Sequence, residues 1–385
     1  MSGTGAAIVG LGMTEMSLRP GATALTLAAR ATRAALADAG LDPDDIDGLL
    51  VGTSQGVRPD RLGVAFAAQG GFGDLRLLEH IEIKGATTLA MVERAARAVS
   101  GGAARAVLCV FADAPLRAGH GAGSSYAHSG GNEGLRGLER ASGVLGSVPT
   151  YALLAQRWLH TTGEDPKALC AVATVQRAWA AGNPQAVMRE PLSEDDYFAS
   201  PLIAEPLRRL DCARPVNGAA AVVVAADPGI GDPRRVTVRG SGRDHPVRRR
   251  RAGAESWFGG GARAVDDALA EAGRTRADLD LAQLYDPFSV VTLMLLAEYG
   301  LCGPVPAGEF VRSGGTGPGG TLPVNTGGGQ LSGFYLQGMT PLVEAVTQLR
   351  GDGGERQVPG AAIALVGGIG GRLDHHAAMI LERTR

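Results

Sequence analysis

The stretch that decides the fold runs from Leu322 to Met339 and reads Leu-Pro-Val-Asn-Thr-Gly-Gly-Gly-Gln-Leu-Ser-Gly-Phe-Tyr-Leu-Gln-Gly-Met. It places Asn325 ahead of three consecutive glycines, Gly327 to Gly329, and places Tyr335 after a further glycine. Such a run could form a phosphate-binding loop, but that loop needs a Lys followed by Ser or Thr, and neither follows here. We therefore interpret the stretch as a turn that holds one wall of a site.

Outside this stretch the chain repeats itself, and the repeats keep their order. The matched pairs are Ala35–Gly40 with Ala268–Gly273, Gly85–Leu89 with Gly338–Leu342, and Ala106–Val110 with Ile363–Gly367. The separation within a pair grows from 233 to 253 and then 257 residues. Three matches in one order favour two duplicated halves with an insertion of about twenty residues in the second.

Each half reads as alternating strands and helices, which is typical of α/β layering. In the first half the pattern predicts strands at Ala6–Val9, Gly48–Val51 and Val107–Phe111, a helix at Thr23–Ala39 that ends at Gly40, and a helix from about Gly85 to Val99. We expect two such sheets, one per half, to pack around shared helices.

The segment from about residue 112 to 210 lies between these units. Residues 119–146 are rich in Gly and Ser, whereas Tyr151–His160 and Lys167–Trp179 have helical spacing. We predict an inserted loop domain that acts as a lid. The predicted division is therefore 1–232 for the first half, which includes the insertion, and 233–385 for the second.

Composition excludes several classes of protein. The chain of 385 residues is 45% hydrophobic and 20% charged, as in ordinary globular proteins. A formal net charge of −2 gives no general attraction to nucleic acid or to anionic membranes, and the longest apolar run, Ala219–Ala226, is far shorter than the ~20 residues of a membrane span. The four cysteines lack CxxC spacing and we recognise no secretory signal, so we expect a cytoplasmic protein without a metal site.

From Tyr151 onward the sequence resembles the lipid-transfer-protein, or sterol carrier protein x, branch of the thiolase superfamily. The segments that carry the resemblance are Ala178–Pro184, Pro191–Asp196, Ser200–Ile203, Pro206–Cys212 and Asn217–Ala221, together with the Ala7–Gly10 opening and the Val324-Asn325 pair. The resemblance implies a thiolase fold of five layers, αβαβα, built from the duplicated halves. It also implies an active site where the halves meet, and usually a homodimer.

Most catalytic residues of thiolases are missing, however. Gly85 occupies the position of the nucleophilic Cys, which thiolases place at the N-terminus of a buried helix. The family's Gly-His-Pro turn has become Phe334-Tyr335-Leu336, which removes the imidazole, and the second Cys is replaced within Leu365–Gly371. Because no acyl-enzyme can form at residue 85, the thiolase route is excluded.

The remaining residues resemble the thiolase-like aldolases that shorten steroid side chains in actinobacteria. The resemblance rests on Tyr285, in the loop Leu284–Phe288, and on Tyr335. It implies retro-aldol cleavage of a β-hydroxy (17-hydroxy) steroid CoA thioester to a ring ketone and propionyl-CoA. We assign Tyr335 to the Cα side and Tyr285 to the hydroxyl. The thioester holds the electrons as an enolate, so we expect no cofactor beyond the CoA that the substrate carries.

Further residues are assigned supporting roles. Backbone N–H groups at Gly85, Gly367 and Gly368 are candidates for an oxyanion hole, and Asn325 for positioning. Weaker candidates for binding substrate or CoA are Asp286, Arg248, His375 and His376. Arginine runs in loops are usually solvated, and histidines that enter a strand are more often structural.

Other conspicuous residues have ordinary interpretations. Tyr126 and His128, in the glycine-rich segment, are interpreted as surface residues, and Cys302 as a small core residue. Gly10-Leu-Gly-Met-Thr-Glu15 begins like a dinucleotide fingerprint but has Glu15 at the third glycine, so we reject that motif.

Two functions stay open at this point. The chain is a thiolase-like aldolase that uses the two tyrosines, or a catalytically inert thiolase-like subunit that binds acyl-CoA or lipid for a larger complex. Relatives of this branch commonly pair with a small OB-fold, zinc-ribbon protein of the domain-of-unknown-function-35 (DUF35) type. We therefore expect such a partner in either case.

Overall fold

A computed structural model describes residues 5–53, 59–126, 134–227, 232, 234–246, 260–371 and 373–383. Arg248 and His128, which the sequence analysis considered, lie outside these residues. Within the described ranges, no helix has both the length and the apolar character needed to cross a membrane.

The strands of the two halves follow the same order. The first half contributes β1 (Gly5–Met13), β2 (Gly48–Gly52), β3 (Leu77–Ile81), β4 (Ala106–Asp113) and β7 (Gly218–Asp227), in the order β3-β2-β4-β7-β1. The second contributes β8 (Val236–Asp244), β9 (Leu281–Leu284), β10 (Ile363–Gly370) and β11 (His375–Arg383), in the order β9-β10-β11-β8. The repeated segment Ala106–Val110 opens β4 and its partner opens β10, so the duplication read from the sequence corresponds to duplicated structure.

The half-sheets are joined at one edge. β1 pairs antiparallel with β8, with Ala7 opposite Thr237 and Ile8 opposite Val236. We expected two separate sheets, and this expectation is wrong in that respect, because the short pairing makes one nine-stranded sheet. Each strand twists, and a link of two residue pairs leaves the halves able to turn toward each other.

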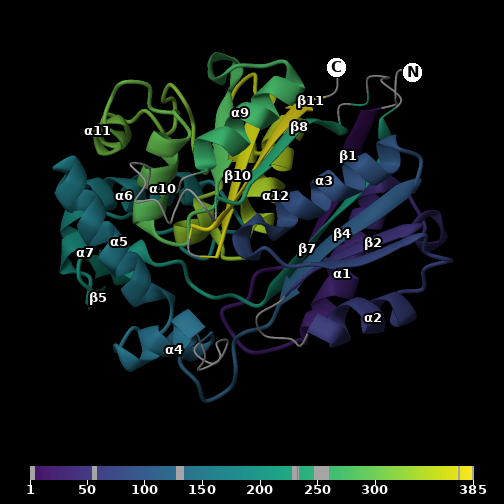
Figure 1. The fold of residues 1–385 in the computed structure, drawn as a ribbon, viewed down its shortest axis with the longest axis horizontal. Coiled ribbons are helices and arrows are strands. Elements are labelled where there is room, and N and C mark those ends of the chain that lie inside the picture. The colour runs from purple at the N-terminus through teal and green to yellow at the C-terminus, as the bar shows by residue number, and fades with distance from the viewer. Residues whose placement is uncertain are drawn as a thin grey trace.

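Helices fill the remaining three layers, as Figure 1 shows. On the outside, α1 (Ala24–Ala39) and α2 (Pro59–Gln69) cover the first half-sheet, whereas α9 (Gly261–Ala272) and α10 (Ser289–Glu298) cover the second. Between them, α3 (Thr87–Ser100) and α12 (Met339–Arg350) contact strands of both halves. The layers therefore run αβαβα, which is the predicted thiolase fold.

The outer helix of each half, which carries the duplicated alanine-rich segment, packs closely on its strand. A Cβ at Gly12 on β1 would lie 2.2 Å from the carbonyl oxygen of Ala31 on α1. In the second half, a Cβ at Gly242 on β8 would lie 2.1 Å from the carbonyl oxygen of Ala264 on α9. Both outer helices thus touch their strands through positions that only glycine can occupy, because interiors are close-packed.

The insertion is anchored in the second half rather than detached. It contains α4 (Gly134–Ala141), α5 (Ser147–Thr162), α6 (Lys167–Ala181), α7 (Glu194–Ala199) and the hairpin β5 (Leu202–Ala204) with β6 (Leu207–Arg208). α6 packs against α10 and α11 (Ala307–Arg312), and their apolar faces share one core. The division into domains at residue 232, between β7 and β8, stays a prediction.

Candidate active site

Two tyrosines meet between loops of the second half. Tyr285 follows β9 directly, and its backbone N–H donates to the carbonyl oxygen of Gly367 at 2.9 Å. Tyr335 follows the π-helical turn Gly329–Gly333. The two hydroxyl oxygens lie 3.1 Å apart, in a hydrogen bond that either group can donate. The structure therefore brings together the two residues that the sequence analysis selected, and their catalytic roles stay predictions.

Both phenols are held in the neutral form. Burial raises the pKa of Tyr335 to about 12, and the Asp113 carboxylate raises it as well, although the hydrogen bond from Tyr285 lowers it. Burial also raises the pKa of Tyr285 well above its usual range, and the neighbouring Tyr335 adds to the effect. Because losing a proton is unfavourable for either phenol, the pair is suited to passing a proton on rather than to storing a charge.

Gly85 packs against the ring of Tyr285. It lies in the 3-10 helix Lys84–Ala86, which leads into α3. A Cβ at residue 85 would lie 2.4 Å from Cζ of Tyr285 and 2.3 Å from the carbonyl oxygen of Ile369. By the resemblance, Gly85 stands where thiolases have their nucleophile. The ring of Tyr285 therefore occupies the space that a side chain at residue 85 would fill. The predicted part of its N–H in an oxyanion hole stays a prediction.

Gly367 and Gly368 lie in β10, between β9 and β11. A Cβ at Gly367 would lie 2.7 Å from Cε2 of Tyr299, at the end of α10. A Cβ at Gly368 would lie 3.0 Å from the carbonyl oxygen of Gly85. These two glycines let the outer helix and the turn before α3 approach opposite faces of β10, and their oxyanion role stays a prediction.

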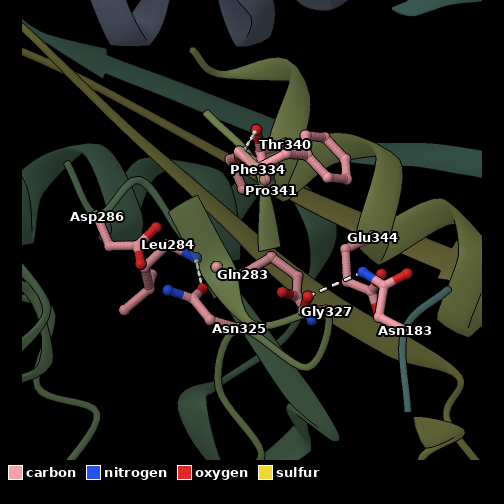
Figure 2. Close-up of a pocket in the computed structure, with 11 residues that line it drawn as sticks. Asn183, Gln283, Leu284, Asp286, Asn325, Gly327, Phe334, Thr340, Pro341 and Glu344 are labelled. Carbon is pink, nitrogen blue, oxygen red and sulfur yellow. Dashed lines mark hydrogen bonds between the residues drawn. The ribbon is translucent and has the colours of Figure 1, made fainter. Parts of the chain in front are cut away.

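Asn325 and Asp286 connect the two tyrosine-bearing loops. Asn325 has a φ of +53°, and its Oδ1 accepts the backbone N–H of Leu284 at 2.6 Å, as Figure 2 shows. The Asp286 carboxylate accepts the backbone N–H of Gln330, with Oδ1 at 3.0 Å. Each bond joins the loop of one tyrosine to the loop of the other, which favours a positioning role for both side chains.

A small pocket lies beside this connection (Figure 2). It is lined by Asn183, Gln283, Leu284, Asp286, Asn325, Gly327, Gly329, Phe334, Thr340, Pro341 and Glu344. Glu344 is paired with Arg356, whose Nε lies 3.0 Å from Oε1. Neither tyrosine lines the pocket, so we interpret it as part of the support behind the loops.

The thiols are not prepared for nucleophilic attack. Burial raises the pKa of Cys170 to about 11 and that of Cys212 to about 12, and it raises the pKa of Cys109 and Cys302 too. A reactive cysteine needs the opposite shift. Cys302 is 8% exposed and packs in the core, as predicted. In the part of the chain that the structure describes, no group of three or more His, Cys, Asp or Glu side chains could hold a metal.

In the described structure, the two histidines among the weaker binding candidates are not hydrogen-bonded to the tyrosines. Nδ1 of His375 lies 3.0 Å from Nδ1 of His245. His376 is fully buried on β11, opposite Ile369 and Asp244. Among the described residues, no hydrogen bond connects either His375 or His376 to the tyrosine pair. Their predicted contact with substrate therefore gains no support from the geometry.

Sequence reasoning missed a second pair of residues at the site. Tyr126 was interpreted as a surface residue, and this was wrong. Its ring lies edge-on to that of Tyr335, with centroids 6.0 Å apart, and its hydroxyl donates to Oδ2 of Asp113 at 3.1 Å. Asp113 ends β4 and is 2% exposed. An acid directly after the buried run Val107–Phe111 and Ala112, at the carboxyl end of a strand, was the signal available.

The buried carboxyl of Asp286 predicts a pH effect on stability. Burial raises its pKa to about 8 in the folded state, despite hydrogen bonds from Gln330 and neighbouring amides that lower it. In the unfolded chain the pKa of this carboxyl is ~3.9. Between pH ~3.9 and about 8 the folded state therefore binds more protons than the unfolded state does. The contribution of Asp286 to the free energy of unfolding falls as the pH rises through this range. We expect Asp286→Asn to lose less stability between pH 5 and pH 8 than the native chain. Urea unfolding at both pH values measures this, with the exposed Asp44→Asn as control, and equal pH dependence would contradict it.

The contact at residue 85 predicts that even one methyl group is harmful. Gly85→Ala should lower the free energy of unfolding by about 1–3 kcal/mol, because the backbone of Ile369 and the ring of Tyr285 must both move. Gly21→Ala is the matched control, since a Cβ there meets no atom within 4 Å, and it should leave stability unchanged or slightly raised. The midpoints of urea unfolding of Gly85→Ala and Gly21→Ala test this prediction, and equal midpoints would refute the steric argument.

Comparisons with known proteins agree with this geometry. A family model described as thiolase C-terminal domain-like matches residues 245–383. The chain is 34% identical to 17-hydroxy-3-oxo-4-pregnene-20-carboxyl-CoA lyase of Mycobacterium tuberculosis over 370 residues, which cover 90% of this chain and 92% of that protein. It is 32% identical to the steroid side-chain-cleaving aldolase of Thermomonospora curvata, over 90% of each chain.

Solved structures extend the likeness to the whole fold. An Ltp2–ChsH2(DUF35) aldolase superposes with a TM-score of 0.84 at 29% identity, covering 99% of this chain and 98% of that one. Human mitochondrial 3-ketoacyl-CoA thiolase in complex with CoA superposes with a TM-score of 0.72 at 17% identity, over 99% and 98% of the chains, which shows the fold alone. The chain belongs to the thiolase-fold family that includes these steroid side-chain-cleaving aldolases.

Proposed function

We propose that this protein is an aldolase that cleaves the side chain of a 17-hydroxy steroid CoA thioester, giving a 17-keto steroid and propionyl-CoA. The observation that carries the proposal is the 3.1 Å hydrogen bond between the hydroxyls of Tyr285 and Tyr335. It lies where the fold's nucleophile would stand, and Gly85 cannot attack a thioester. A retro-aldol reaction needs proton transfer and no covalent intermediate.

The two hydroxyls form a path for one proton. The substrate hydroxyl gives its proton to Tyr285, which passes its own proton to Tyr335, and Tyr335 protonates Cα. The bond between Cα and the hydroxyl-bearing ring carbon breaks, its electrons pass through a thioester enolate to Cα, and the ring carbon becomes a ketone. Atoms and charge balance without water or any external acid.

A relay also avoids an unfavourable charged state. Since the pKa of Tyr335 is raised to about 12, a free phenolate at pH 7 would cost on the order of 7 kcal/mol. In the relay each phenol accepts one proton as it releases another, so neither becomes a free anion. The thioester serves as the electron sink, and we propose that no cofactor is needed beyond the CoA of the substrate.

The names of the relatives support the substrate class and a partner. Two of them, at 34% and 32% identity, are named as a 17-hydroxy steroid CoA lyase and a steroid side-chain-cleaving aldolase. The Ltp2–ChsH2(DUF35) aldolase has a DUF35 protein in its name, and we propose that this chain also works with a small partner of that type. The four free cysteines are in keeping with a reducing cytoplasm, where we place the protein.

We further propose a homodimer formed through β3. This strand ends the nine-stranded sheet, and such an edge is open to a second copy. Leu78 on β3 is 47% exposed, and Val64 on the adjacent α2 is 67% exposed. We expect light scattering after gel filtration to give twice the 39.4 kDa chain mass. Leu78→Lys should yield monomer, whereas Leu153→Lys, at an exposed site on α5, should not; a dimeric Leu78→Lys would exclude this interface.

The proposed reaction predicts that removing the hydroxyl oxygen of either Tyr285 or Tyr335 greatly lowers kcat. With a 17-hydroxy steroid CoA thioester, with and without a DUF35 partner, we expect mass spectrometry to detect both the ketone and propionyl-CoA. Tyr285→Phe and Tyr335→Phe should each lower kcat by about 10²–10⁴-fold and still bind the thioester. Tyr299→Phe is the matched control, because its buried hydroxyl has no hydrogen-bond partner in the described structure. Tight binding without cleavage under every pairing would leave the inert acyl-CoA-binding subunit.

A further inference from the structure

We propose that Tyr126, held by Asp113, is a positioning residue that orients the Tyr335 ring toward Tyr285. The proposal deepens the proposed function, on which its catalytic consequence rests. It assigns a role to Asp113, at the end of β4, and to Tyr126, in the insertion of the first half, whereas both proposed catalytic tyrosines belong to the second half.

Hydrogen bonds fix the position of the backbone around Tyr335, but they do not fix the direction of its ring. The hydroxyl of Thr340 donates to the carbonyl oxygen of Phe334 at 2.9 Å and accepts the N–H of Leu336 at 3.0 Å. Tyr335 itself forms a bridge with Pro215. These contacts fix where the side chain starts. The direction of the ring depends on what touches the ring.

Two specific contacts act on that direction, in addition to the apolar core against which Tyr335 packs. At the tip, the hydroxyl meets that of Tyr285 at 3.1 Å. At the side, Tyr126 lies edge-on, with ring centroids 6.0 Å apart and the ring planes 62° apart. This separation is within the favourable range for edge-to-face aromatic pairs. Without Tyr126, the hydrogen bond to Tyr285 would be the remaining specific contact on a ring that otherwise only packs against the apolar core.

Asp113 fixes Tyr126 in turn. The hydroxyl of Tyr126 donates to Oδ2 of Asp113 at 3.1 Å, and Oδ1 of the same carboxylate accepts the N–H of Ala114 at 2.9 Å. Asp113 is the last residue of β4, where it pairs with Gly218 of β7. The anchor is therefore part of the rigid sheet, and it is 2% exposed. A hydrogen bond to a charged group is also stronger than one between neutral groups.

Tyr285 needs no such support, because its ring already lies against Gly85 and the backbone of Ile369. Both phenols belong to the second half, and a residue of the first half lies against each of them, Gly85 against Tyr285 and Tyr126 against Tyr335. A proton can pass between them only while both oxygens stay within hydrogen-bond distance, and a misplacement of about 1 Å can lower a rate by on the order of 10²-fold.

The first test measures position without measuring activity. The chain has six tyrosines, so the ¹⁹F NMR spectrum of protein labelled with 3-fluorotyrosine should be resolvable, and Tyr335→Phe identifies the Tyr335 signal. We expect Tyr126→Leu to shift or broaden that signal. Phe72→Leu is the matched control, since it removes one ring of the edge-on pair Phe66 and Phe72, 5.7 Å apart, at a remote site. An unchanged Tyr335 signal in Tyr126→Leu would overturn the proposal, whether or not the native protein cleaves a steroid.

The second test uses turnover of the native complex. Tyr126→Phe and Asp113→Ala should each lower kcat about 10-fold with KM within 2-fold, and the double variant should be no slower than Asp113→Ala alone, because that variant already removes the hydrogen bond that Tyr126→Phe removes. Asp113→Asn keeps Oδ1 as acceptor for the N–H of Ala114, and its amide N–H can donate to the Tyr126 hydroxyl, so it should restore most of the rate. Losses that multiply in the double variant, or a native kcat in Tyr126→Phe, would refute the role of the bond. If the native complex fails to cleave, the proposed function fails and the NMR result alone decides the positioning role.

Discussion

The hydrogen bond between the hydroxyls of Tyr285 and Tyr335 depends on one constraint, which is that a full aromatic ring must fit beside residue 85. The missing Cβ at Gly85 meets this constraint, since any side chain there would collide with Cζ of Tyr285 and with the backbone of Ile369. The absence of a nucleophilic side chain at residue 85 and the presence of the Tyr285 ring therefore depend on each other, because both cannot fit in the same space. This explains why the fold is retained although the chemistry that the thiolase fold usually supports is absent.

The loops around the pair are organised to preserve that contact. Asn325 binds the N–H that precedes Tyr285, and Asp286 binds the N–H of Gln330 at the start of the turn before Tyr335. Both side chains are almost completely buried, and burial raises the pKa of the Asp286 carboxyl to about 8. Burying the Asp286 carboxyl is unfavourable, but its hydrogen bond to the N–H of Gln330 fixes the spacing between the two loops. Such compromises are typical of functional sites.

The duplicated architecture explains how one site can be supported from two sides. Helices α3 and α12 lie between the half-sheets, and a Cβ at Gly338, just before α12, would lie 2.6 Å from the carbonyl oxygen of Gly85, just before α3. The two repeated segments found in the sequence therefore meet at the centre of the molecule. From the first half come Gly85 and the Asp113–Tyr126 pair, and from the second come the two phenols.

The sequence by itself determined the duplication, the alternation of strands and helices, and the choice of Tyr285 and Tyr335. The duplication and the alternation follow from local patterns, and the two tyrosines follow from the resemblance to thiolase-like aldolases; neither depends on knowing how distant segments meet. Only the tertiary structure decided that β1 and β8 join the half-sheets, and that Gly85 makes room for a ring. It also decided that Tyr126, in a glycine-rich segment with the composition of a surface loop, reaches the site. Each of these depends on contacts between residues far apart in the chain, whose distances no local pattern contains.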